Sequence, residues 1–228
     1  MNFPSFEIID ISQPVNSQTA CFPGDTPFGH EVMVSYQQSG VMNLTAFRMS
    51  PHVGTHADAP VHIGGNITQP GGGTESVAQL DLKLFLGPVA VVDVSPCAGP
   101  IGWEQVEDQL LAYPAFPPRI LFKTRQTLRY TVFEDDYAWL SVSLIETLAQ
   151  RNACLVGLDT PSVDAVDSKT LETHHALLQA NMVWLENLDL SQVHVRREVP
   201  ELYFLSALPL KLTELEASPV RAVLLRFT

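Results

Sequence analysis

Residues 50–62 concentrate side chains that can bind a metal ion or carry a proton. Three of the seven histidines, His52, His56 and His62, lie in this span together with Asp58. Imidazole nitrogens and a carboxylate form a ligand set that suits zinc or manganese. Ordinary surface histidines are the alternative, but clustered ligands at short spacing are a far stronger signal than a single histidine. The segment therefore predicts a metal site.

The same segment is expected to be extended and not helical. Pro60 lacks a backbone N–H and clashes with the preceding helical turn, and Gly54 also disfavours a helix. Successive side chains of an extended chain point to opposite sides, so the four even-numbered candidates would project from one face.

A second group of candidates lies later in the chain. A predicted helix over 170–179 carries His174 and His175, of which only one can easily face the site, and a predicted strand over 182–187 contains Glu186. A buried carboxylate is costly unless it is paired, and metal coordination would remove that cost. For this segment alone, a salt bridge or exposure at the strand end explains Glu186 equally well. Combined with the first cluster, His174 and Glu186 become candidates for a second metal.

These side chains would support metal-assisted hydrolysis of an amide or ester. A divalent ion polarises a carbonyl oxygen and lowers the pKa of a coordinated water. His62 best fits the general acid/base, which takes a proton from water and returns it to the leaving amine. His30 and His194 are expected at the surface. Asp159 and Asp164 flank a turn, whose chemistry explains them adequately.

The elements that must position these residues follow from apolar patterns and turn signals. Strands are predicted over 6–12, 43–49, 87–94, 119–124, 154–159 and 182–187, and helices over 77–82, 102–112, 141–150 and 170–179. Strand, helix and strand alternate in the second half, which predicts an α/β fold. No internal repeat or composition shift marks a boundary, so residues 1–228 are expected to form a single domain.

Composition narrows the class of protein. The chain has 228 residues, is 46% hydrophobic and 17% charged, and carries a net charge of −12, which argues against nucleic-acid or anionic-membrane partners. Cys21, Cys97 and Cys154 are widely spaced, so neither a disulfide framework nor a thiolate metal site is expected. The first residues do not form a signal peptide and no apolar stretch is long enough to span a membrane, so we expect a cytoplasmic protein.

The sequence resembles the cyclase-like metal hydrolase family, and within it the bacterial kynurenine formamidase branch. The family signature, His-x-Gly-Thr-His-x-Asp-x-Pro-x-His, is present from His52 to His62. The motifs Phe22-Pro-Gly-Asp-Thr-Pro27, Ser168-Lys-Thr170 and His174-His-Ala176 indicate the formamidase branch.

This resemblance implies a role for each metal-site candidate. His52, His56 and Asp58 would bind a first zinc ion. Asp58 and Glu186 would bridge to a second zinc ion, which His174 completes. Two zinc ions per subunit are thus implied, with manganese or another divalent ion as the alternative.

The resemblance also implies a reaction. His62 would be the general acid/base, Phe22 would contact the substrate's aromatic ring, and N-formyl-L-kynurenine would be hydrolysed to L-kynurenine and formate in tryptophan degradation. The family has an α/β fold of the swivelling β/β/α type, a single domain with a mixed sheet and flanking helices, and its members are usually homodimers. The segment 113–137 departs most from the family, which affects the expected substrate range if it lines the pocket.

Two rival functions remain open at this point. A related amide hydrolase with the same metal site, such as an isatin hydrolase, differs mainly in its pocket loops. A non-catalytic metal-binding protein is disfavoured by His62, because a purely structural zinc needs no spare base.

Overall fold

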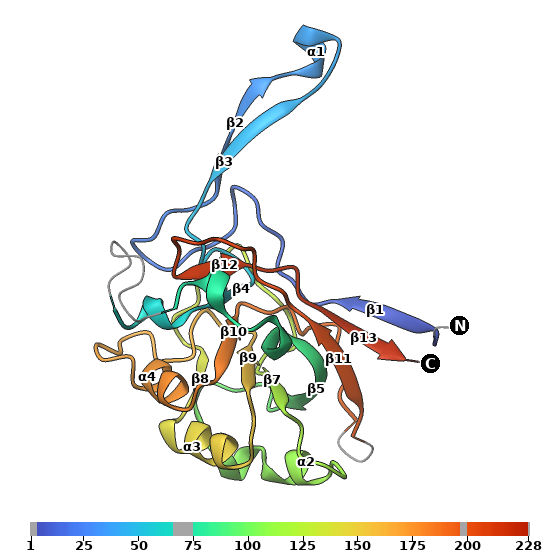
Figure 1. Ribbon diagram of the computed structural model, residues 1–228, viewed down its shortest axis with the longest axis vertical. Coiled ribbons are helices and arrows are strands. Elements are labelled where there is room, and N and C mark those ends of the chain that lie inside the picture. Colours follow the sequence, from blue (N-terminus) through green and yellow to red (C-terminus); the bar gives the residue numbers. More distant parts are fainter. Residues whose placement is uncertain (1–3, 66–74, 197–199, 228) are drawn as a thin grey trace.

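The computed structural model describes residues 4–65, 75–196 and 200–227, and its largest element is one mixed β-sheet (Figure 1). In spatial order the nine strands are β1 (Phe6–Asp10), β13 (Val223–Phe227), β11 (Leu202–Ser206), β5 (Leu86–Asp93), β7 (Arg119–Lys123), β9 (Leu155–Leu158), β10 (Val183–Glu186), β4 (His56–Asp58) and β12 (Ala217–Pro219). The central strands β5, β7, β9 and β10 run parallel, and the other pairs are antiparallel. The predicted α/β fold with a mixed sheet is confirmed.

The parallel strands are buried on both faces, because their alternate side chains enter two separate hydrophobic cores. On β5, Val89 and Val91 belong to one core and Val92 to the other. On β7, Leu121 and Phe122 divide in the same way. Such double burial explains why these strands read as continuous apolar runs in the sequence.

Short helices cover the two faces of the sheet. The helices α2 (Glu107–Leu111), α3 (Val142–Gln150) and α4 (Glu172–Gln179) pack on one face, and the 3₁₀ turns η2 (Val77–Gln79) and η3 (Leu82–Phe85) contribute to the core of the other. Helix α3 begins where Ser141 Oγ accepts a hydrogen bond from the Leu144 backbone N–H, a cap that stabilises a helix by about 1 kcal/mol.

Most predicted elements form, but two predicted helices are shorter than expected. The helix predicted over 77–82 is replaced by η2 and η3, because Asp81 accepts a hydrogen bond from the Lys83 backbone N–H and restarts the turn. The helix predicted over 102–112 divides into η4 (Trp103–Gln105) and α2 at Val106. The three cysteines are free thiols.

A two-stranded arm extends from the body of the molecule (Figure 1). It consists of β2 (Gly29–Val34), the one-turn helix α1 (Tyr36–Ser39) and β3 (Leu44–Arg48). Within the described part of the chain, strands β2 and β3 pair only with each other, and α1 has no buried residue. The strand predicted over 43–49 is therefore correct, but it belongs to the arm and not to the main sheet.

A second small pairing joins β6 (Gly99–Ile101) and β8 (Ala138–Leu140) in parallel. Among the described residues, no helix has both the length and the apolar character that a membrane crossing requires. The extent of the domain over residues 1–228 stays a prediction.

Candidate metal centre

The segment 50–62 brings its candidates together by turning, which corrects the prediction of one extended strand. Only His56 and Asp58 lie on a strand, β4, where their i, i+2 spacing puts them on one side. Gly54 has φ of 71°, and a Cβ there would meet Val15 Cγ2 at 2.7 Å, so the turn before β4 requires glycine. This turn carries His52 back beside β4.

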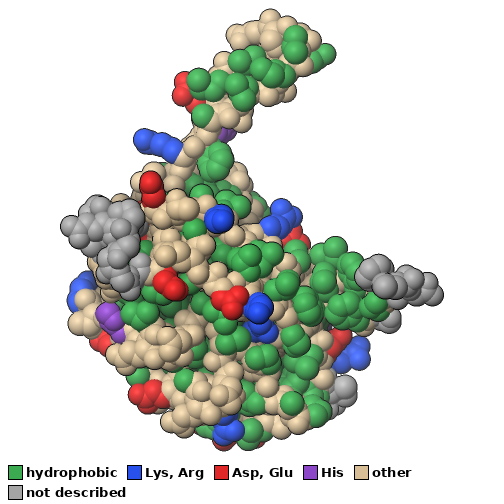
Figure 2. Space-filling view, in the orientation of Figure 1, with side chains coloured by type: hydrophobic (Ala, Val, Ile, Leu, Met, Phe, Trp, Pro, Cys, Tyr) green, Lys and Arg blue, Asp and Glu red, His purple; other side chains and the backbone are tan. Residues whose placement is uncertain are grey.

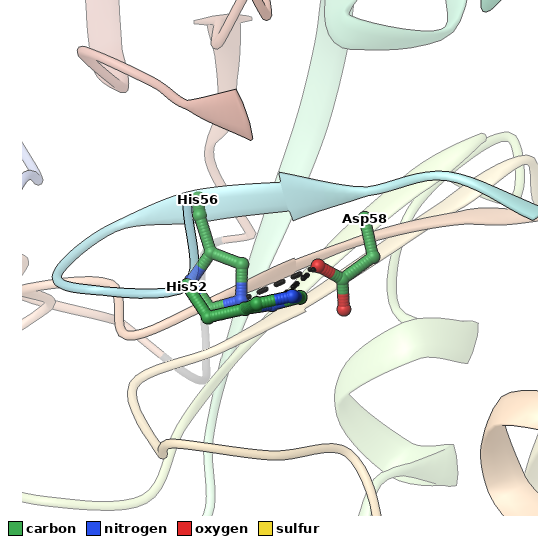
Figure 3. A group of neighbouring side chains, drawn as sticks. All are labelled: His52, His56 and Asp58. Atoms are coloured by element: carbon green, nitrogen blue, oxygen red, sulfur yellow. Dashed lines mark ion pairs between the residues drawn. The ribbon is translucent and has the colours of Figure 1, made fainter. Parts of the chain in front are cut away.

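The first three candidates form a tight cluster around one carboxylate oxygen. Asp58 Oδ1 lies 3.1 Å from His52 Nδ1 and 3.4 Å from His56 Nε2 (Figure 3). His56 and Asp58 are 1% exposed, and both buried atoms, His56 Nε2 and Asp58 Oδ1, have no hydrogen-bond partner among the described residues.

Neighbouring groups fix which nitrogen of each histidine faces the cluster. His56 Nδ1 lies 2.9 Å from the Gly54 carbonyl oxygen, so it donates there and leaves the Nε2 lone pair directed at the carboxylates. His52 Nε2 lies 3.4 Å from Glu216 Oε1. Outer acceptors of this kind orient histidines that bind metals.

The second group of candidates joins the first from α4 and β10. His174 Nε2 lies 3.9 Å from Asp58 Oδ2 and 3.6 Å from Glu186 Oε1. Glu186 Oε2 lies 3.4 Å from His56 Nε2, so this carboxylate contacts both histidines. His174 is buried whereas His175 is exposed, which identifies the histidine that faces the site.

Asp164 holds His174, and turn chemistry is therefore the wrong explanation of this aspartate. Asp164 Oδ2 lies 2.6 Å from His174 Nδ1, and its carboxylate also accepts the Thr173 and His174 backbone N–H groups. The imidazole of His174 thus contacts the Asp164 carboxylate with one nitrogen and faces the site with the other. Metal-binding histidines are usually supported by a carboxylate in this way. Two further supporting residues were not apparent from the sequence. Glu216 contacts His52, and the Nε1–H of Trp184 donates to Asp58 Oδ2 at 2.9 Å.

The electrostatics of the cluster require positive charge. Burial alone would raise the pKa of Asp58, but the surrounding His56 and His52 hold this pKa well below its ordinary range. Burial alone would lower the pKa of His52, yet Asp58, Glu216 and Glu186 outweigh it and raise the pKa to about 10. These buried carboxylates need positive charge beside them. Protonated histidine can supply it, and so can a divalent cation bound by the deprotonated ligands.

The donor set fits such a cation. His56 Nε2 faces two carboxylate oxygens, and either a proton on this nitrogen or a cation between the three atoms satisfies the arrangement. Ligand atoms bound at 2.0–2.1 Å around a tetrahedral ion are roughly 3.3 Å apart, and the separations around Asp58 Oδ1 are 3.1 and 3.4 Å. His52, His56 and Asp58 thus fit a divalent metal, and a second group of Asp58, His62 and His174 has ligand atoms within 4.8 Å of one another.

His62 lies beside the cluster on η1 (Pro60–His62). Its ring centroid is 4.6 Å from that of His52 and 5.6 Å from that of His174. The ring has no hydrogen-bond partner among the described residues, and it lines the pocket. Burial lowers the pKa of His62, so its imidazole is neutral near pH 7 and can accept a proton.

The cluster opens into a pocket of about 550 Å³, a usual size for a small-molecule site. Phe22 lines it and packs edge-on against Phe133, with ring centroids 5.1 Å apart. Seven residues of the segment 113–137, which we expect to depart from the family, also line this pocket, and they are Arg125, Leu128, Arg129, Tyr130, Val132, Phe133 and Glu134. His30 and His194 are exposed, as expected.

Comparison with known proteins agrees with this geometry. Residues 9–165 match the model of the Cyclase family, described as "Putative cyclase". The chain belongs to the Cyclase family. It is 39% identical to a kynurenine formamidase of Bordetella petrii over 94% of this chain and 96% of the relative. It is 38% identical to a kynurenine formamidase of Bacillus cytotoxicus over 96% of this chain and 97% of the relative.

The fold agrees with that of a solved structure. Isatin hydrolase A from Ralstonia solanacearum superposes with a TM-score of 0.77 at 25% identity, covering 96% of this chain and 92% of that one. The expected family and the expected hydrolytic class of enzyme are confirmed by these relatives, and the side-chain cluster supports a divalent metal.

Proposed function

We propose that the protein hydrolyses N-formyl-L-kynurenine to L-kynurenine and formate, with two zinc ions per subunit. The observation that carries this proposal is the identity with kynurenine formamidases over nearly the whole of both chains. The convergence of His52, His56, Asp58, His174 and Glu186 supports it. Asp58 belongs to two adjacent groups of potential ligands, one with His52 and His56 and one with His62 and His174, and Glu186 lies 3.4 Å from His56 and 3.6 Å from His174.

The residues divide the chemistry between them. The bound metal would polarise the formyl oxygen and make water more acidic. His62 takes the proton of the attacking water while the water oxygen bonds to the formyl carbon, and gives it to the anilide nitrogen as the C–N bond breaks. Phe22 and Phe133 form an apolar wall for the aromatic ring, which orients the formyl group.

A metal-removal experiment tests this proposal. Zinc-loaded protein should release kynurenine from N-formyl-L-kynurenine, chelation should abolish the release, and added zinc should restore it. Absorbance of kynurenine gives the rate, and metal analysis of the same samples gives the zinc content. Stoichiometric zinc without turnover would contradict the proposal. Isatin serves as the second substrate, because the likeness to isatin hydrolase A favours a cyclic amide as the alternative.

The proposal includes a homodimer formed through the arm; a cytoplasmic location stays a prediction. Seven apolar side chains of the arm are about half or more exposed, and they are Val32, Met33, Tyr36, Val41, Met42, Leu44 and Phe47 (Figure 2). Each of these side chains exposes an area on the order of 100 Å². Together they supply roughly the 800 Å² per partner that a specific interface buries. A second copy of the chain, bearing the same arm, satisfies this surface symmetrically.

Polar substitutions on the arm are expected to dissociate this dimer. Val41 and Phe47 are 77% and 69% exposed, so a Val41→Ser, Phe47→Ser double variant removes interface area without disturbing the body. Light scattering after gel filtration should give twice the chain mass for the unmodified protein and one chain mass for the variant. Leu111→Ser, which alters a 55% exposed leucine on α2, is the control and should remain dimeric. A variant that stays dimeric would place the interface elsewhere.

A further inference from the structure

The pocket contains a second charged cluster that the hydrolytic chemistry does not use. Arg125 and Arg129 each form an ion pair with Glu134, with nitrogen–oxygen distances of 2.9 and 2.8 Å. All three side chains line the same pocket as His52 and His62. We propose that this cluster binds the α-amino-acid end of the substrate, with Arg125 binding its carboxylate; the inference rests on the proposed function.

The sheet places this cluster at a defined separation from the metal centre. Arg125 follows the carboxyl end of β7, Asp159 follows that of β9, and Glu186 ends β10. These strands are adjacent and parallel, so their carboxyl ends meet at one edge, the usual position of a ligand in such sheets. Two strand spacings, roughly 10 Å, separate the carboxyl ends of β7 and β10, and Arg125 lies just beyond the first of these ends. A ligand with its reacting carbonyl at the metal and a charged tail beyond an aromatic ring spans a distance of this order.

Arg125 is held in place at its backbone. Asp159 Oδ2 accepts the backbone N–H groups of Thr124 and Arg125 at 2.9 and 3.1 Å, and Asp159 Oδ1 accepts the Thr124 hydroxyl at 2.6 Å. Asp159 is buried and accepts these bonds from the strand end, so the turn chemistry inferred from the sequence does not explain this aspartate fully. A fixed backbone reduces the entropy that binding would lose at this residue.

The chemistry of the cluster matches a zwitterion. The guanidinium of Arg125 is planar and binds carboxylates through two parallel N–H groups, and Glu134 is its only side-chain partner among the described residues. Glu134 orients this guanidinium and supplies a negative charge for an α-ammonium group. The pair of arginines with one glutamate has a net positive charge, and Lys169 and Asp25, which also line the pocket, add one charge of each sign.

The same segment also supplies the aromatic wall. Phe133 packs on Phe22, and the Tyr130 carbonyl oxygen accepts the Ala20 backbone N–H at 2.8 Å. Residues 125–134 therefore place ring contacts and tail contacts on one continuous piece of chain. This piece lies within 113–137, the part of the sequence that we expect to depart most from the family and therefore to influence substrate preference.

The test compares substrates with and without the tail. Zinc-loaded protein and its Arg125→Ala variant are assayed with N-formyl-L-kynurenine and with formanilide, an aryl formamide that lacks the amino-acid group. We expect the variant to lose about 10- to 100-fold in kcat/KM on the first substrate and less than about twofold on the second. Arg125→Lys should recover part of the loss. Arg226→Ala, which removes an arginine paired with Glu7 at the far edge of the sheet, is the control.

A binding measurement separates failure of this inference from failure of the proposed function. L-Kynurenine and 2-aminoacetophenone, which lacks the tail, are titrated into both proteins, and the variant should weaken only L-kynurenine. If the unmodified protein hydrolyses neither formamide, the proposed function fails and this titration alone decides the subsite. Equal losses on both ligands or both substrates, or no loss on either, would overturn the assignment of Arg125.

Discussion

The His62→Ala variant is expected to lose about 10²- to 10⁴-fold in kcat while keeping the metal content of the unmodified protein. His62 lies against both His52 and His174, is neutral near pH 7 and has no hydrogen-bond partner among the described residues. Its loss removes the group that moves the proton and leaves the carboxylates and three histidines of the centre intact. Rates and zinc content are measured on the same samples.

Two further measurements distinguish a base from a ligand. Added imidazole should restore part of the lost rate, because a small base can enter the space that the missing ring leaves. His194→Ala, which removes an exposed histidine, should change nothing. Loss of metal from the His62→Ala variant would instead assign His62 to the ligand group that it forms with Asp58 and His174.

The Asp58→Asn variant is expected to lose both metal and activity. Asp58 contacts His52 and His56 through one oxygen and approaches His174 with the other, so its charge serves both groups of ligands. Polarisation by the metal contributes several kcal/mol to such reactions, so a loss of about 10³-fold or more is expected. The amide has nearly the same shape as the carboxylate, which limits the disturbance of packing.

Thermal unfolding with and without zinc gives a readout of this variant that does not depend on activity. A ligand at a thousand times its Kd stabilises the folded state by about 4 kcal/mol, so zinc should raise the Tm of the unmodified protein and not that of the variant. Asp108→Asn, at an exposed position of α2, is the control and should respond to zinc normally. An Asp58→Asn protein that is stabilised by zinc and active would show that this carboxylate is dispensable.

The four parallel strands at the centre of the sheet were predictable from the sequence because burial on both faces makes them apolar. The strands β5, β7, β9 and β10 are buried on both faces, so each reads as an uninterrupted apolar run. The strand β2 is largely exposed and β12 has three residues, one of them Pro219, so neither has a periodic pattern that distinguishes it from a loop. The strand β12 pairs with β4, which lies far away in the chain, and local patterns do not contain such a partner.

The candidate site was also predicted where local sequence is informative and missed where contacts depend on the fold. The proposed ligands and His62 were found by type and spacing, and the fold brings them together. The extended geometry expected for 50–62 was wrong because Gly54 turns the chain and Pro60 begins η1. Asp164, Glu216 and Trp184 were missed because each supports a ligand across the fold, at a sequence distance that no motif records.

The two halves of the centre differ in how they depend on the folded chain. His52, His56 and Asp58 lie within seven consecutive residues, so an unfolded chain keeps them as a local chelating peptide. His174 and Glu186 join them only when α4 and β10 have docked on the sheet. Metal held by the first half alone binds the unfolded chain as well, and such binding reduces the stabilisation that it gives to the native state. The ligands His174 and Glu186 are therefore the ones through which metal binding favours the folded chain over the unfolded chain.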